Sequence, residues 1–193
     1  MVERGLNPSL AVVLGTVLFS ALVGGSQQFP EDNPELGVYQ NEGEYLSLEE
    51  DWYEMYRNFQ EDPYFGGKAK CIVATQISQS DDGSATLTVK YDDGTSMKVR
   101  GTPKSSPGYA VNNVLQVDSL DNPGVSFNIT NVYKDKKQCM VARHSYADGG
   151  KGCSLWRPES AIGKGDSCCD FIFDLVCGTS KKYQIYDACL AGN

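Results

Sequence analysis

The chain is short of positive charge. Its 193 residues include 17 Lys and Arg against 25 Asp and Glu, which gives a formal net charge of -8 at pH 7. Nucleic-acid backbones are bound by basic surfaces, so a nucleic-acid partner is disfavoured. Hydrophobic residues make up 40% of the chain, a fraction typical of globular proteins rather than disordered or fibrous ones. We expect one compact domain.

The chain also lacks the common catalytic and metal-binding motifs. His144 is the only histidine, and there is no Gly-x-Ser-x-Gly elbow, which argues against Ser-His-Asp and Cys-His catalysis. The glycine clusters do not have the spacing of a phosphate loop, and the acidic turns do not have that of a calcium loop. Cys-x-x-Cys and His-x-x-x-His spacings are missing as well, which disfavours zinc. We predict a protein that is not an enzyme and needs no metal or cofactor.

Long apolar runs are absent beyond the first 25 residues. The one such run, at 10–23, follows the basic side chain of Arg4 and precedes small residues at 24–26. This order is typical of a secretory signal peptide, and the run is shorter than the roughly 20 residues of a membrane-spanning helix. We predict that residues 1–25 are a signal peptide and that the mature protein is secreted, extracellular and without a membrane partner. An uncleaved anchor is the alternative.

Cysteine, by contrast, is abundant. Seven cysteines in a chain of this length favour a disulfide framework, which forms in an oxidising compartment. An odd number cannot all pair within one chain, so one thiol should remain outside the intrachain bonds. Secretion also makes the one sequon, at Asn128, a usable glycosylation site.

Two segments precede the strand-rich part of the chain. Residues 26–46 mix Pro, Gly and acidic side chains without apolar periodicity, so we predict an acidic mobile leader there. Ser47 and Glu50 have capping-box spacing, and apolar residues then recur at helical spacing up to Asp62-Pro63. We predict that a helix begins at Ser47 and ends at this pair, and that the main domain covers 47–193.

After residue 63 the pattern changes to alternation between apolar and polar residues. Turn signals such as Asp-Gly separate the alternating segments, which favours a sequential antiparallel meander. The segments are 71–78, 84–91, 95–100, 109–117, 125–133, 139–146 and 153–158. Seven or eight such strands favour an up-and-down barrel, with a sandwich as the alternative. A second helix, from Ser167 to the stop at Gly178, should lie outside this barrel.

The order of these features resembles the tick salivary lipocalins, the family that includes the female-specific histamine-binding proteins. The resemblance runs from about Ser47 to Leu190. It is carried by Asp62-Pro63, Cys71, Cys139, Leu155-Trp156, Cys168, Gly178 and Ala188-Cys189. It implies a mainly β fold: an eight-stranded antiparallel up-and-down barrel with an N-terminal helix and a C-terminal helix packed outside. The general lipocalin signature Gly-x-Trp near the first strand is absent.

The resemblance also implies disulfides from Cys71 to Cys189 and from Cys139 to Cys168. Cys153 should face outward if Trp156 faces the cavity, because neighbouring side chains on a strand alternate. Cys153 would then bond Cys177 or Cys169 on the second helix, and spacing does not decide between them.

Counting from an outward Cys139 predicts which side chains line the barrel. Met140, Ala142 and His144 should point inward, together with Ser154 and Trp156 on the next strand. His144 is either a satisfied core residue or a ligand contact. The resemblance places Phe59, Asp62 and Phe65 near the barrel mouth, where histamine binders carry aromatic residues.

The ligand is less determined than the fold. Amine-binding members of the family carry acidic residues at the positions that Met140 and Ser154 occupy here. They carry a third acidic residue at the position of Thr130. Without these acids an ammonium would be poorly paired in the cavity. We therefore expect a monomer that sequesters a small-molecule host mediator, leaning to a lipid such as a leukotriene or fatty acid. The alternatives are a biogenic amine, with a weaker site at Asp62, and a host protein partner, as in complement inhibition.

Overall fold

The computed structural model describes residues 29–43, 46, 48–165 and 167–190. The predicted signal peptide, residues 1–25, lies outside these described residues, as do residues 26–28 of the predicted leader.

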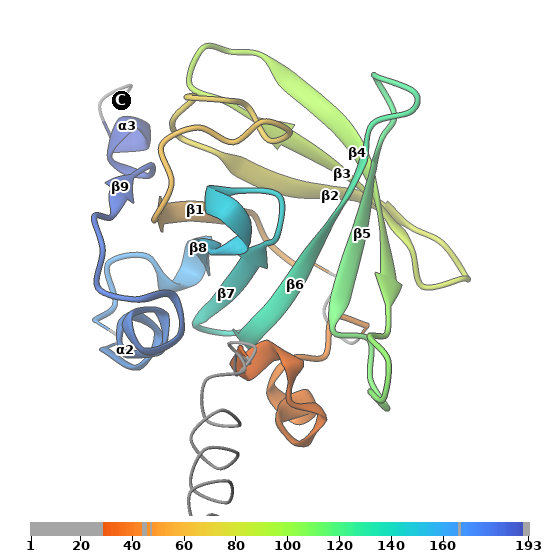
Figure 1. Ribbon diagram of the computed structural model, residues 1–193. Helices are drawn as coiled ribbons and strands as arrows, with labels where there is room; N and C mark the ends of the chain where they lie inside the picture. Colours follow the sequence, from red (N-terminus) through yellow and green to blue (C-terminus); the bar gives the residue numbers. More distant parts are fainter. Residues whose placement is uncertain (1–28, 44–45, 47, 166, 191–193) are drawn as a thin grey trace, which may run out of the picture.

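Eight antiparallel strands form a closed barrel in which each strand pairs with its neighbour in sequence (Figure 1). The ring closes because β1 pairs with both β8 and β2. The strands are β1 (Trp52–Arg57), β2 (Val73–Gln79), β3 (Ala85–Lys90), β4 (Ser96–Lys104), β5 (Val114–Ser119), β6 (Ser126–Asp135), β7 (Cys139–His144) and β8 (Gly152–Pro158). A two-residue strand, β9 (Tyr183–Gln184), pairs with β1 from outside the ring. The predicted up-and-down barrel is confirmed.

Helices occupy the outside and the ends of the barrel. Short 3-10 helices are η1 (Pro30–Asp32), η2 (Pro34–Tyr39), η3 (Asp148–Gly150) and η4 (Glu159–Ala161), and the α-helices are α2 (Ser167–Cys177) and α3 (Asp187–Leu190). The predicted second helix is α2, and Gly178 after it has a φ of +82°, which favours glycine. Among the described residues no helix is long and apolar enough to cross a membrane.

The helix predicted to begin at Ser47 is wrong, because the segment forms strand β1. Its apolar residues are buried on both faces: Trp52 faces the interior of the barrel, and Tyr56 packs on Phe173 of α2 with ring centroids 4.8 Å apart. A bulge between Glu54 and Tyr56 also shifts the alternation. A strand buried on two faces does not show a period of two, so the same residues matched a helical spacing.

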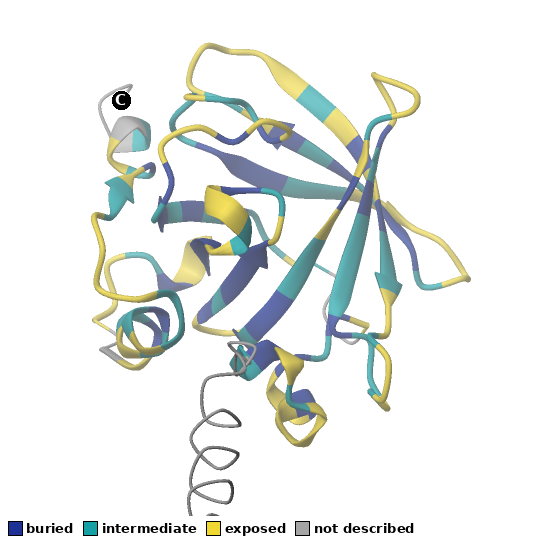
Figure 2. Ribbon diagram, in the orientation of Figure 1, coloured by how far each residue is buried: buried dark blue, intermediate teal, exposed yellow. Residues whose placement is uncertain are grey.

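The leader also differs from the expectation, because its described residues pack on the barrel. η1 and η2 lie against β6, and Glu31, Gln40 and Glu42 are buried (Figure 2). Glu31 forms an ion pair with Arg143, whose guanidinium carbon lies 4.4 Å from the ring centroid of Phe29. Acidic composition predicted mobility, but these acids have buried cationic partners on the barrel.

Three disulfides join the barrel to the C-terminal segment. Cys71 bonds Cys189, as the resemblance implies, and Cys153 bonds Cys177, one of the two partners left open by spacing. Cys139 bonds Cys169, which corrects the expected bond to Cys168. Successive residues of a helix point about 100° apart, and it is Cys169 that shares the buried face of α2 with Phe173, whereas Cys168 is exposed.

The Cys139–Cys169 bond should contribute measurably to stability because it closes a loop of the chain and holds α2 on β7. Replacing both cysteines by Ala is expected to lower the free energy of unfolding by about 2–5 kcal/mol, measured by denaturant titration. Cys168→Ala is the matched control and should change it by less than about 0.5 kcal/mol, since Cys168 is exposed. Non-reducing peptide mapping that found Cys139 joined to Cys168 would contradict the arrangement.

Candidate functional site

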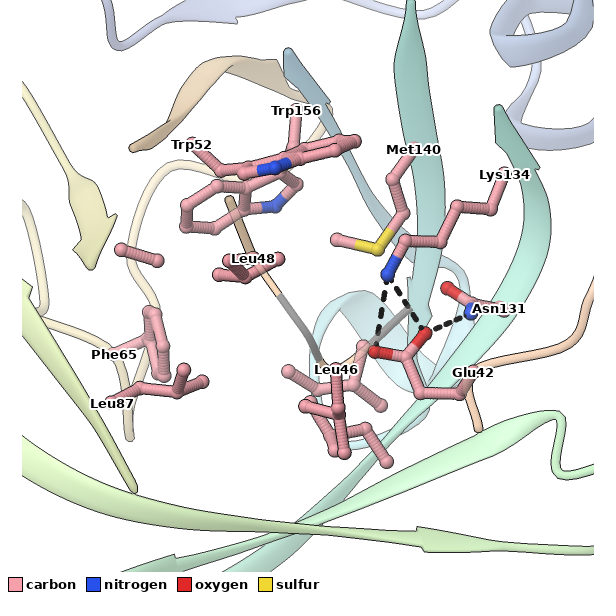
Figure 3. Close-up of a pocket in the computed structure, with 13 residues that line it drawn as sticks. Glu42, Leu46, Leu48, Trp52, Phe65, Leu87, Asn131, Lys134, Met140 and Trp156 are labelled. Carbon is pink, nitrogen blue, oxygen red and sulfur yellow. Dashed lines mark hydrogen bonds and ion pairs between the residues drawn. The ribbon is translucent and has the colours of Figure 1, made fainter. Parts of the chain in front are cut away.

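An apolar cavity of about 70 Å³ lies inside the barrel (Figure 3). Its wall combines aliphatic and aromatic side chains from the strands with residues that precede β1. The lining residues are Glu42, Leu46, Leu48, Trp52, Phe65, Ala74, Leu87, Leu115, Ile129, Asn131, Lys134, Met140 and Trp156. Such a wall binds apolar groups without offering them hydrogen bonds.

The one polar part of this wall is a cluster of Glu42, Asn131 and Lys134. The Lys134 ammonium lies 3.2 and 3.3 Å from the two carboxylate oxygens of Glu42, and the Asn131 amide donates to the same carboxylate. All three residues are buried. Burial lowers the pKa of Lys134, and the neighbouring Glu42 carboxylate opposes that shift. The cluster therefore compensates both buried charges within the protein itself.

A larger depression of about 500 Å³ adjoins the cavity and shares Leu48, Trp52 and Lys134 with it. Its remaining lining residues are Glu49, Glu50, Lys136, Lys137, Ser160 and Lys164. The Glu50 carboxylate already accepts hydrogen bonds from the backbone and hydroxyl of Ser160, at 2.7 and 2.8 Å. Three lysines besides the paired Lys134 face two glutamates, so this depression is more positive than the protein as a whole.

A second polar cluster begins at the Trp156 indole and lies where β7 ends and β8 begins. The Trp156 indole donates to Ser154 Oγ at 2.8 Å, Ser154 Oγ lies 2.6 Å from His144 Nε2, and His144 Nδ1 lies 2.8 Å from the Tyr146 hydroxyl. Tyr146 in turn donates to Asp62 Oδ2 at 3.2 Å. A neutral His144 protonated on Nδ1 satisfies every contact in this chain.

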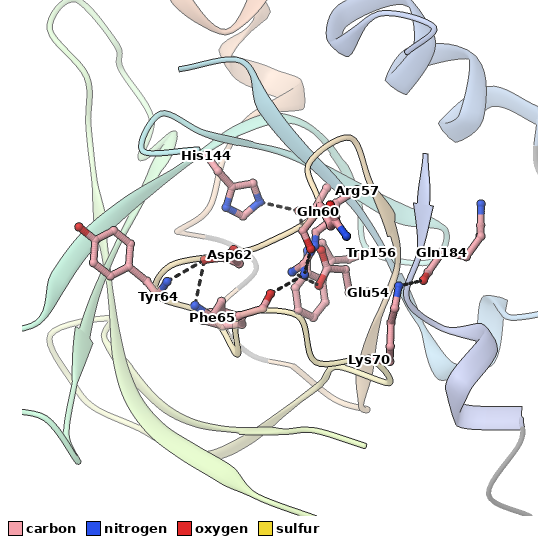
Figure 4. Close-up of polar contacts among 12 residues, drawn as sticks. Glu54, Arg57, Gln60, Asp62, Tyr64, Phe65, Lys70, His144, Trp156 and Gln184 are labelled. Atoms are coloured by element: carbon pink, nitrogen blue, oxygen red, sulfur yellow. Dashed lines mark hydrogen bonds and ion pairs between the residues drawn. The ribbon is translucent and has the colours of Figure 1, made fainter. Parts of the chain in front are cut away.

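Both oxygens of the Asp62 carboxylate accept hydrogen bonds. Besides the Tyr146 hydroxyl, the backbone N–H groups of Tyr64 and Phe65 donate to its other oxygen, each at 2.9 Å (Figure 4). Nearby, the Glu54 carboxylate lies 3.7 Å from the guanidinium of Arg57, and burial raises the pKa of Glu54 to about 7 despite this cation. Within the described part of the chain no group of three His, Cys, Asp or Glu residues could hold a metal.

The structure divides the predicted ligand residues into groups. Phe65, Met140 and Trp156 line the cavity. Asp62, His144 and Ser154 form the second polar cluster, and Phe59 packs against the His144 ring with centroids 5.3 Å apart.

Two predicted residues contribute neither to the cavity wall nor to the second polar cluster. Ala142 is fully buried and pairs with Ser154 in the β7–β8 ladder. Thr130 lies between Ile129 and Asn131, which both line the cavity, while Thr130 does not. Asn128, two residues earlier, is exposed on β6 and is therefore accessible to a glycosylating enzyme.

Sequence reasoning missed Glu42, Asn131 and Lys134. Alternation along β6 from Phe127 would have placed Asn131 inside, but the bulge between Asn131 and Tyr133 reverses the pattern before Lys134. Glu42 carries no local signal, because its place depends on a pairing with a strand 89 residues away in sequence.

His144 is expected to titrate near pH 4, because burial lowers its pKa to about 4. NMR can follow this one imidazole directly. An unfolded histidine has a pKa near 6.5 and so binds more protons than the folded state between pH 6.5 and 4. The free energy of unfolding should therefore fall by up to about 3 kcal/mol as the pH is lowered through that window, and His144→Gln should remove this part of the pH dependence.

Glu54 acts in the opposite sense and supplies the control. Its raised pKa lets the folded state bind the additional proton between pH 4.5 and 7, so its contribution to stability is lost as the pH rises through about 7. Glu54→Gln should therefore make the free energy of unfolding fall more steeply than in the wild type as the pH is lowered from 7 to 4.5. An imidazole that titrates near pH 6.5 would show that His144 is solvated and would contradict the buried chain of hydrogen bonds.

Comparison with known proteins gives one family and several structures of the same fold. The family model described as tick histamine binding protein matches residues 30–191. No curated protein matches the chain significantly. Japanin from Rhipicephalus appendiculatus, solved with cholesterol bound, is 14% identical over 72% of this chain and 94% of its own, with a TM-score of 0.51. A biogenic amine-binding protein, solved as its selenomethionine derivative, is 13% identical over 75% of this chain and 80% of its own, with a TM-score of 0.50.

Identities this low establish the shared barrel alone, whereas the family model spans nearly all of the chain that the structure describes. The match begins at Pro30 in η1 and so includes the N-terminal segment that packs on β6. The chain belongs to the tick histamine-binding protein family and folds as its lipocalin barrel.

Proposed function

We propose that this protein is a secreted lipocalin that sequesters a small host mediator, and that the mediator is a lipid with an acidic head group, such as a fatty acid or a leukotriene. One observation carries the proposal: an apolar cavity adjoins a depression bordered by four lysines. The apolar cavity would hold the hydrocarbon chain of an acidic lipid, and the lysines of the depression would lie beside its acidic head group.

The cavity wall favours an apolar chain. Leu46, Leu87, Leu115 and Ile129 provide aliphatic contacts, and Met140 provides a flexible thioether that adapts to ligand shape. A hydrocarbon leaves no polar group unpaired on such a wall, whereas a polar ligand would lose hydrogen bonds to water without replacing them.

The adjoining depression favours an anion. Lys136, Lys137 and Lys164 surround it, and Lys134 lies at its junction with the cavity. A positive potential at the entrance raises the local concentration of anions and lowers that of ammonium ions.

A biogenic amine is the weaker candidate for this wall. The one carboxylate of the wall, Glu42, is already paired with Lys134. Met140 offers no carboxylate, and the Ser154 hydroxyl is engaged by His144 and Trp156. Asp62, where a weaker amine site was expected, already accepts three hydrogen bonds. The two fold relatives were solved as a cholesterol complex and as a biogenic amine-binding protein, so the choice of ligand in this fold rests on the wall and not on the barrel.

The cellular setting is part of the proposal. Three disulfides within the chain fit an oxidising, extracellular compartment. Secretion as a monomer in tick saliva would place the barrel where host inflammatory mediators are released.

Intrinsic fluorescence tests the proposal, because the chain has two tryptophans and both Trp52 and Trp156 line the cavity. Titrating the protein, secreted from eukaryotic cells, with a fatty acid or leukotriene should change the emission and saturate. Histamine and serotonin should bind at least about tenfold more weakly, the factor that about 1.4 kcal/mol of unpaired charge produces.

A pair of variants shows whether the ligand occupies this cavity. Ala74→Leu fills space at the wall and should abolish lipid binding, while Ala110→Leu makes the same change at an exposed position outside the barrel and should not. Tight histamine binding that survives Ala74→Leu, with no response to either lipid, would contradict the proposal.

A further inference from the structure

The cavity already contains a carboxylate, and it belongs to the protein. Glu42 comes from the segment that precedes β1 and is 3% exposed. Its carboxylate accepts hydrogen bonds from Asn131 and Lys134 at the polar side of an otherwise apolar cavity (Figure 3). A carboxylate at the edge of an apolar space is the arrangement that an acidic lipid would itself present.

The partners of this carboxylate are fixed by the barrel rather than by the segment that carries Glu42. Asn131 and Lys134 both lie on β6, whose ladders with β5 and β7 hold its backbone. Lys134 also lies 5.6 Å from the ring centroid of Trp52. An ammonium and an amide held in this way form a receptor for a carboxylate whichever molecule supplies it.

The ammonium of Lys134 depends on a neighbouring carboxylate for charge compensation. Lys134 is 5% exposed, and a buried ammonium needs an anion beside it. If Glu42 leaves, Lys134 keeps its charge only beside another anion. A ligand carboxylate satisfies this requirement, whereas a neutral lipid does not.

Cavity size points the same way. A cavity of about 70 Å³ is smaller than the about 300 Å³ at the lower end of ligand pockets. Part of its wall consists of Glu42, Leu46 and Leu48, which precede β1 and belong to no strand of the barrel. Withdrawal of these side chains enlarges the cavity without breaking the barrel ladders.

We infer that Asn131 and Lys134 are the site that binds the head group of a carboxylate ligand, and that Glu42 occupies this site until the ligand's carboxylate exchanges with it. The inference rests on the proposed function and goes further, because it names the head-group chemistry, the two residues that recognise it and the internal competitor. An ammonium ligand would act in the opposite way, by competing with Lys134 for Glu42.

The test compares a fatty acid with the fatty alcohol of the same chain length, using tryptophan fluorescence and calorimetry. Glu42→Gln removes the competing charge and should strengthen fatty-acid binding by about tenfold, the factor that one charge-assisted hydrogen bond corresponds to. Binding of the alcohol should change much less. Glu35→Gln is the matched control, an exposed acid on η2 of the same segment, and should bind both ligands as the wild type does. Lys134→Met should weaken binding of the fatty acid and leave binding of the fatty alcohol unchanged.

Hydrogen exchange on the wild type keeps the test independent of whether the variants fold. Fatty acid should increase exchange in peptides that contain Glu42 and leave those of β6 protected, while the alcohol should not increase it. If acid and alcohol bind alike in all variants, or if Glu42→Gln weakens binding of the acid, the exchange of carboxylates is refuted and the lipid-binding proposal stands. If no variant, the wild type included, binds the fatty acid, the proposed function itself fails.

Discussion

The arrangement of the whole molecule follows from backbone pairing along β1. This strand must satisfy its hydrogen bonds on two sides, with β8 on one and β2 on the other, because otherwise the meander would end in two open sheet edges. Pairing with β8 extends along the strand, whereas pairing with β2 joins only Trp52 to Ala74 and Tyr53 to Val73. The barrel is therefore closed at one level and splayed beyond it, and the segment after β1 returns into the interior, where Phe59, Asp62 and Phe65 are buried.

This closure separates the interior into two chemical environments. On one side of Trp156 lies the apolar cavity, and on the other lies the cluster of Asp62, His144 and Ser154. The Trp156 indole belongs to both, because its ring forms part of the cavity wall while its N–H donates to Ser154. The hydrogen bond holds the ring in one orientation and so sets the shape of the cavity wall.

Outside the barrel, two disulfides hold α2 against β7 and β8, from Cys139 to Cys169 and from Cys153 to Cys177. Cys139 and Cys153 must point outward to form these bonds. Met140 and Trp156 therefore point inward, because neighbouring side chains on a strand alternate. Buried ion pairs complete the structure at Glu31–Arg143 and Glu42–Lys134. Such pairs add little net stability, but they bind the N-terminal segment in one position, because each charge is costly without its partner.

The sequence by itself determined the local and periodic features. Alternation and Asp-Gly turns are properties of neighbouring residues, so the meander and helix α2 could be predicted, and so could the inward direction of Met140 and Trp156. The barrel was implied by the family resemblance, because alternation alone also allowed a sandwich. Tertiary structure decided the features that depend on residues distant in the chain. The segment 52–57 is a strand because β8 and β2 pair with it, and Cys169 rather than Cys168 bonds Cys139 because the buried face of α2 turns it inward. Glu42 lies in the cavity because Lys134 is there to compensate its charge, a contact that no local pattern encodes.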